Sequence, residues 1–264
     1  MRLRPAPVRR PYRAVAPLVG VLTLGLLGAC SFGTDSAEPP ADAASDQQPS
    51  MLPSAPVEIA AAEAPACLSE GVAFGAVGAE ATKVAWAGSG DRGVLLAPQA
   101  GGDACQWADE LVRLAGAGYL VATYEWGTSG QVGFEAALDV LDATGAQRVA
   151  FVGASAGGTL AAGLADDLGA VAVVALSPPA EYEGVDARAA SSTFTGPLQV
   201  FSSTDDPQVP ATDSAQVPRN DRSSIVTEVS GTAHGIEFLA ADNVHREHVR
   251  TVVDEALAEG FGEG

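Results

Sequence analysis

The sequence predicts an α/β fold with a mainly parallel sheet that helices cover on both faces. From about residue 66 onward, short apolar runs alternate with longer segments whose apolar residues recur at helical spacing. The short runs are apolar almost throughout, which is typical of strands buried on both faces. Glycines bound the short runs and end several of the helical segments. The sequence shows no internal repeat, so we expect residues 66–264 to form one domain.

The expected elements follow one another in a regular order. Strands are expected at 82–88, 92–98, 119–126, 148–154, 170–177, 197–203 and 224–231. Helices are expected at 104–118, 134–145, 156–169 and 245–261, where the apolar residues follow a helical period. About 20 residues separate the strands at 170–177 and 197–203. That segment is too short for a large lid domain.

The N-terminal residues have the pattern of an export signal. Residues 1–13 carry five arginines and no acid, and residues 14–29 form an apolar run. This run is short for a membrane span and suits a signal peptide. The next residue is Cys30, and "LGAC" at 27–30 resembles the lipobox of bacterial lipoproteins. The resemblance implies removal of residues 1–29, lipidation of Cys30 and anchoring to the outer face of a bacterial membrane.

Two alternatives concern this export signal. One is an ordinary secretory signal in which the cysteine occurs by chance. The other concerns the export route, because the Arg9-Arg10 pair could direct twin-arginine export.

Residues 30–65 lack a periodic apolar pattern, and six prolines interrupt them. We expect a disordered tether there, and a flexible coil of about 35 residues would span about 30–35 Å.

Charge and cysteine content limit the partners and the redox state. The formal net charge of −19 repels nucleic acid and anionic lipid head groups, so we expect neither as a partner. Cys67 and Cys105 remain once Cys30 is lipidated. An exported domain with two cysteines is expected to hold one disulfide, although two free buried thiols are the alternative.

A G-x-S-x-G pattern places Ser155 at the end of an expected strand. The stretch "RVAFVGASAGGTLAAGLADD" runs from a β-branched strand through small residues into a helix rich in Ala and Gly. The pattern alone is weak, but this context resembles the nucleophile turn of the α/β-hydrolase family. In that turn Gly153 and Gly157 leave room for the sharp bend. The N–H of Ala156 then points from a helix N-terminus toward the hydroxyl.

A serine nucleophile needs a base, and the base needs an acid that orients it. His234 follows the last expected strand, whereas His245 and His248 lie on the last helix. The latter two are explained by a solvated helical face, with a metal site as a weak alternative. For the acid we prefer Asp206, because "DPQVP" at 206–210 resembles the acid loop of the α/β-hydrolase family. Asp205 is the alternative.

The resemblance to this family extends over residues 82–260. The order Ser155, Asp206, His234 is the order that the family has. "LAPQAGGDACQW" resembles its oxyanion loop, with Pro98 and Gln99 where His and Gly are usual. The resemblance implies an oxyanion hole formed by the N–H groups of Ala156 and Ala100, with Gln99 adjacent.

The expected function is therefore a serine hydrolase that cleaves small carboxylic esters, without a metal or cofactor. A peptidase or other acyl hydrolase is one alternative. A catalytically inactive binding lipoprotein with the same fold is another. The sequence does not specify an oligomeric state.

Overall fold

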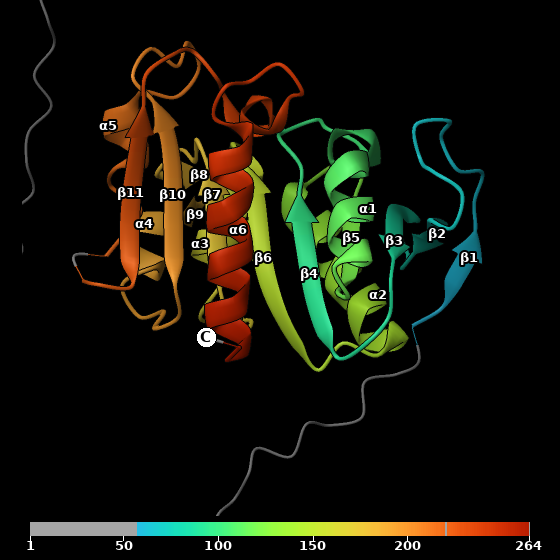
Figure 1. Cartoon of the computed structure of the whole chain (residues 1–264). Helices are drawn as coiled ribbons and strands as arrows, with labels where there is room; N and C mark the ends of the chain where they lie inside the picture. Colours follow the sequence, from blue (N-terminus) through green and yellow to red (C-terminus); the bar gives the residue numbers. More distant parts are fainter. Residues whose placement is uncertain (1–56, 220, 264) are drawn as a thin grey trace, which may run out of the picture. The chain divides into compact units, whose positions relative to one another are not determined.

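A computed structural model describes residues 57–219 and 221–263, which are built around one large sheet (Figure 1). Its strands are β1 Ile59–Ala61, β2 Ala73–Val77, β3 Thr82–Ala87, β4 Arg92–Ala97, β5 Leu120–Tyr124, β6 Arg148–Ala154, β7 Val173–Leu176, β10 Leu198–Ser203 and β11 Ser224–Val229. The nine strands lie in the order β1-β2-β3-β5-β4-β6-β7-β10-β11. The pairs from β1 to β5 are antiparallel, and all pairs from β5 to β11 are parallel. The expected mainly parallel sheet is confirmed.

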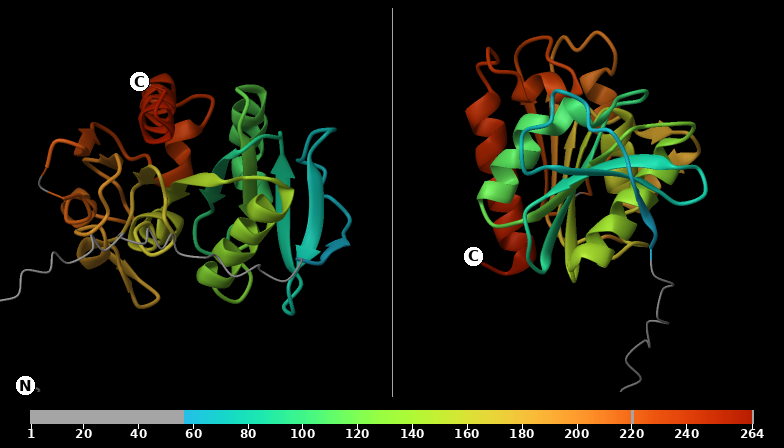
Figure 2. Two further views of the ribbon diagram at one scale, coloured as in Figure 1. Left: turned by 90° about the horizontal axis from the view of Figure 1, so that it is seen from below. Right: turned by 90° about the vertical axis from the view of Figure 1, so that its right-hand side faces the viewer.

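Helices cover both faces of the sheet, as the two views in Figure 2 show. The longer helices are α1 Ala108–Gly116, α2 Gly130–Thr144, α3 Ala156–Gly163 and α6 Arg246–Phe261. Helices α1 and α6 pack on one face, where Leu111 and Val253 join one apolar cluster. Helices α2 and α3 pack on the other, where Phe134 and Leu160 join a second cluster. The two buried clusters explain why the strands are apolar on both sides.

The parallel register aligns the ends of the central strands. Ala97 at the end of β4 is opposite Gly153 in β6, and Ala154 is opposite Leu176 in β7. The loops that follow β4, β6, β10 and β11 therefore open at one edge of the sheet, the upper edge in Figure 1. In open parallel sheets this edge carries the ligand site.

The folded part begins earlier than the sequence indicated. Strand β1 lies inside the range 30–65 that was expected to be a tether, and Ile59 is opposite Val77 in β2. A three-residue strand is too short to show periodicity in the sequence, which is why it was missed. The expected signal segment 1–29, Cys30 and the tether up to residue 56 lie outside the described residues.

Several helix boundaries also differ from the expectation. Helix α2 begins at Gly130, four residues before the expected start, and α3 ends at Gly163 instead of residue 169. A Cβ built on Gly130 would overlap the Trp126 ring, and one built on Gly133 would overlap the Tyr124 ring. These glycines let the helix approach the rings closely, so they do not mark a loop.

The segment between β7 and β10 contains only small elements, as expected for a fold with no large lid. It holds the hairpin β8 Glu181–Tyr182 and β9 Val185–Asp186, followed by α4 Ala187–Ala190. Tyr182 packs edge-on against Trp126, with ring centroids 5.9 Å apart. The remaining short helices are η1 Ala104–Trp107, α5 Ala211–Ser214 and η2 Gly235–Leu239. Among the helices of the described residues, none is both long and apolar enough to cross a membrane.

Candidate active site

Ser155 occupies a strained turn between β6 and α3. Its φ of 52° and ψ of −123° are unusual for a residue that carries a Cβ. The N–H of Ser155 donates to the carbonyl of Leu176, 2.7 Å away, which fixes the turn to β7. A Cβ on Gly153 would lie 2.6 Å from the Gly158 nitrogen, and one on Gly157 would lie 2.7 Å from the Ala97 carbonyl carbon. Only glycine fits on either side, and Ser155 is left half-buried at the sheet edge.

His234 and Asp206 form a buried pair beside this turn. His234 follows β11 and is 1% exposed, and its Nδ1 lies 2.8 Å from Asp206 Oδ2. Asp206 Oδ1 accepts hydrogen bonds from the N–H groups of Gln208 and Val209, at 2.8 and 3.0 Å. The alternative acid, Asp205, is exposed and accepts a hydrogen bond from the neighbouring Thr204 hydroxyl. The structure therefore brings Asp206, and not Asp205, to the histidine.

The surroundings of Asp206 favour its ionised form. Burial raises the pKa of this carboxyl. Hydrogen bonds from the Val209 and Gln208 N–H groups and from His234 together lower the pKa by more, so that it falls below the ordinary value of 3.8. At neutral pH the carboxylate can accept a hydrogen bond from the Nδ1–H group of His234. With its proton on Nδ1, the neutral imidazole has an unprotonated Nε2 that can accept a proton from a donor.

The loop of His234 lies against the turn of Ser155. A Cβ built on Gly235, which follows the histidine, would lie 3.3 Å from the Ser155 nitrogen. No hydrogen bond joins the Ser155 hydroxyl to His234 in the described part of the chain. Bonds of this kind are often long before substrate binds. The sequence-predicted Ser155, Asp206 and His234 thus come from three loops to one place.

The residues expected to form the oxyanion hole lie in the loop after β4 and at the start of α3. Ala156 is the first residue of α3, where the helix dipole favours negative charge. Ala100 is exposed in the loop. The backbone N–H of Gln99, however, donates to Oε1 of Gln106 at 3.0 Å. Gln99, expected beside the donors of the oxyanion hole, cannot offer its own backbone N–H there because that group already donates to Gln106. The reason is a side-chain contact seven residues along the chain, which the loop motif does not show.

The two other histidines lie apart from this pair. Nε2 of His245, at the N-terminus of α6, is 3.1 Å from the Ser230 carbonyl. The exposed His248 packs edge-on against the Phe201 ring, with centroids 5.7 Å apart. Within residues 57–219 and 221–263, no group of three or more His, Cys, Asp or Glu is arranged to hold a metal ion.

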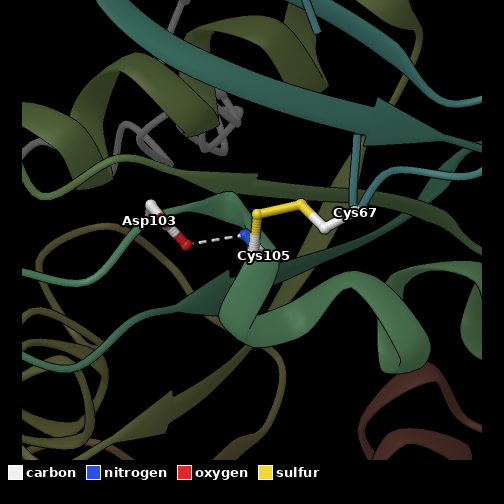
Figure 3. The surroundings of a disulfide bond; sticks show 3 residues. All are labelled: Cys67, Asp103 and Cys105. Atoms are coloured by element: carbon white, nitrogen blue, oxygen red, sulfur yellow. Dashed lines mark hydrogen bonds between the residues drawn. A yellow bond between two sulfur atoms is a disulfide. The ribbon is translucent and has the colours of Figure 1, made fainter. Parts of the chain in front are cut away.

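The expected disulfide is present in the structure (Figure 3). Cys67 and Cys105 are bonded across 38 positions of sequence, with Cα atoms 5.6 Å apart. Asp103 accepts a hydrogen bond from the N–H of Cys105 at 2.9 Å and so begins η1. The bond therefore attaches the segment before β2 to the loop that follows β4. The sequence did not predict the contact of Gln106 with Gln99, because nothing marks Gln106 beyond its place in an expected helix.

Among known proteins, this chain is similar to solved structures but matches no family model or curated sequence. A predicted CIB-like hydrolase from Thermoplasma acidophilum is similar in structure, with a TM-score of 0.52 at 19% identity over 70% of this chain and 98% of that one. A monoacylglycerol lipase from Paleococcus ferrophilus gives 0.53 at 16% identity, over 67% and 99%. An esterase from Thermogutta terrifontis gives 0.52 at 18% identity, over 74% and 94%.

The three matches cover 94–99% of the neighbours' chains. The protein therefore has the fold of the α/β-hydrolase superfamily.

Proposed function

We propose that the protein is a serine hydrolase that cleaves carboxylic esters through an acyl-enzyme. The observation that carries the proposal is the buried pair of His234 and Asp206, 2.8 Å apart, beside the strained turn of Ser155. A serine hydroxyl is a weak nucleophile unless a base takes its proton. The His234 loop lies against the serine turn, and the low pKa of Asp206 keeps the orienting carboxylate charged.

In the proposed reaction, Ser155 Oγ attacks the ester carbonyl while Nε2 of His234 takes the hydroxyl proton. Asp206 stabilises the imidazolium that results. The N–H groups of Ala156 and Ala100 donate to the carbonyl oxygen as it becomes negative. The carbon–oxygen bond to the alcohol then breaks, and His234 returns the proton to the departing alkoxide. Water repeats the sequence on the acyl-enzyme, which releases the acid and restores Ser155.

Three observations support a small ester as the substrate. Only a short hairpin and the four-residue helix α4 lie between β7 and β10, so the described residues provide no large cap. The net charge of −19 disfavours anionic polymers. Two structural neighbours are described as a monoacylglycerol lipase and an esterase.

Kinetics of single variants test the proposal. On a short-chain aryl ester, Ser155→Ala or His234→Ala should lower kcat by several orders of magnitude, since the three groups act as a unit. Asp206→Ala should cost somewhat less. Asp205→Ala is the matched control and should retain activity, because that carboxylate is exposed and hydrogen-bonded to Thr204. Full activity in Ser155→Ala would refute the proposal, and a damaging Asp205→Ala beside a mild Asp206→Ala would refute the acid assignment.

We also propose that the protein is exported and anchored to the outer face of the membrane through lipid on Cys30. The lipobox-like residues 27–30 and the preceding apolar run support this. Metabolic labelling with a fatty-acid analogue should mark the wild type. Cys30→Ala should be unlabelled and either released or left unprocessed. A wild-type protein that is secreted freely without label would contradict the anchor.

A further inference from the structure

Two glutamines connect the disulfide to the loops of the candidate active site. Gln106 directly follows Cys105, and its Oε1 accepts the backbone N–H of Gln99 at 3.0 Å. The Oε1 of Gln99 in turn accepts the backbone N–H of Ile236 at 2.9 Å. Ile236 is two residues beyond His234. A continuous chain of contacts thus runs from the disulfide through the loop after β4 to the loop of the histidine.

The surrounding backbone is shaped to admit both side chains. A Cβ built on Gly102 would lie 2.6 Å from Nε2 of Gln106, so the loop after β4 folds closely over that side chain. A Cβ built on Gly235 would lie 2.8 Å from Oε1 of Gln99. Gly235 has a φ of +52°, and the same Cβ would come within 3.3 Å of the Ser155 nitrogen. The Gln99 amide therefore packs against the loop of His234 at Gly235, the residue that also approaches the turn of Ser155.

The loop after β4 departs from the usual family sequence, and hydrogen bonds made by Gln99 hold it in place. The loop after β4 reads Pro98-Gln99 where the family has His-Gly. It is closed by a bond from the Gly102 N–H to the Gln99 carbonyl at 2.8 Å. The Gln99 residue thus uses its N–H, its carbonyl and its side-chain oxygen in holding neighbouring segments. Of these three groups only the backbone N–H could donate to an oxyanion, and it already donates to Gln106.

We propose that Gln99 and Gln106 are positioning residues. Gln99 holds the His234 loop against the proposed oxyanion loop. Gln106, next to the disulfide-bonded Cys105, accepts the backbone N–H of Gln99 and so holds Gln99 in place. This inference rests on the proposed function, since it assigns a role in aligning Ser155 and His234. Neither glutamine forms a hydrogen bond with the Ser155 hydroxyl or the His234 ring among the described residues. Their loss should lower the rate of the reaction at Ser155 more than it alters substrate binding.

Methionine variants remove the acceptor oxygens while nearly keeping the side-chain length. In Gln99→Met and Gln106→Met we expect kcat on the aryl ester to fall by about five- to a hundredfold, because small misplacements of reacting groups carry costs of this size. KM should stay within about twofold. The rate of labelling by a fluorophosphonate, which needs only an aligned serine and base, should fall by the same factor. Gln131→Met on the exposed surface of α2 is the matched control and should react at the wild-type rate.

Two further variants separate positioning from a general loss of structure. Gln106→Glu keeps an oxygen that can accept the Gln99 N–H, so it should recover most of the labelling rate lost in Gln106→Met. The double variant with methionine at both positions should label about as slowly as Gln99→Met alone, because Gln106 acts through Gln99. The melting temperature, measured for every variant, reports the folded fraction at the assay temperature.

Labelling of Gln99→Met and Gln106→Met at the wild-type rate would overturn the inference. So would rates that fall only in proportion to the folded fraction. Both outcomes require a wild type that is labelled at Ser155. A wild type that is folded and not labelled would refute the proposed function itself, and the two failures are therefore distinguishable.

Discussion

Gly157→Ala is expected to damage both stability and activity, because of where the added methyl group would lie. A Cβ at this position would overlap the carbonyl oxygens of Ala97 and Pro98 and lie 2.7 Å from the Ala97 carbonyl carbon. Real Cβ atoms essentially never approach within 3.0 Å, and the obstructing atoms are backbone atoms that cannot swing aside. The start of the proposed oxyanion loop must therefore move away from Ser155 by roughly 1 Å.

The size of both effects follows from this displacement. Forcing an extra methyl group into a packed site costs about 1–3 kcal/mol. For a domain of this size, a loss of about 2 kcal/mol lowers Tm by about 4–8 °C. A misplacement of about 1 Å between reacting groups can cost about a hundredfold in rate. We expect kcat on a short-chain aryl ester to fall by at least about tenfold at a temperature where the variant is fully folded.

Two other glycines provide a graded comparison in the same assays. At Gly158 a Cβ would meet the Gly153 carbonyl oxygen at 3.1 Å, so Gly158→Ala should be milder. At the exposed Gly116, in α1, a Cβ would meet nothing within 4 Å. Gly116→Ala should leave kcat unchanged and keep or slightly raise Tm. Wild-type activity and Tm in Gly157→Ala would refute the reasoning about the turn.

Two further predictions concern the disulfide and the acid of the proposed triad. Reducing the bond between Cys67 and Cys105 should lower Tm, since a loop of this length contributes about 3–4 kcal/mol in the chain-entropy model. It should also lower kcat before the domain unfolds, and an unchanged kcat with the bond shown to be broken would leave the disulfide a role in stability alone. The pKa of Asp206 is lowered in the folded state, so its ionised form stabilises the fold above the ordinary pKa of 3.8. That stabilisation is lost as pH falls through the folded pKa. In urea unfolding at neutral pH the wild type should therefore be more stable than Asp206→Asn. The difference should shrink as the pH falls below 3.8, and a constant difference would contradict the assigned pKa direction.

The central part of the fold could be predicted from the sequence because its signals are local. Strand β6, the turn at Ser155 and helix α3 follow from a β-branched run, small residues and an Ala/Gly-rich segment. The spacing of the other parallel strands is equally visible, since each is a short apolar run next to a helix. The pairing of Asp206 with His234 was expected because the order Ser155, Asp206, His234 along the chain resembles that of the α/β-hydrolase family.

Other features depend on contacts that local patterns do not contain. Strand β1 has three residues, and the hairpin strands β8 and β9 have two each, so none shows a period. The early start of α2 depends on the rings of Trp126 and Tyr124, which Gly130 and Gly133 allow to pack closely. The bond from Ile236 to Gln99 spans 137 positions. Such a contact is fixed only when the whole sheet is assembled.

The proposed function depends most on Ser155 as an activated nucleophile. Treatment with a fluorophosphonate, followed by mass spectrometry of peptides, tests this directly. We predict one adduct, located on Ser155, which is absent in Ser155→Ala and forms far more slowly in His234→Ala at unchanged folding. A folded wild-type protein that gains no adduct, or gains one at another residue that survives Ser155→Ala, would contradict the proposed function.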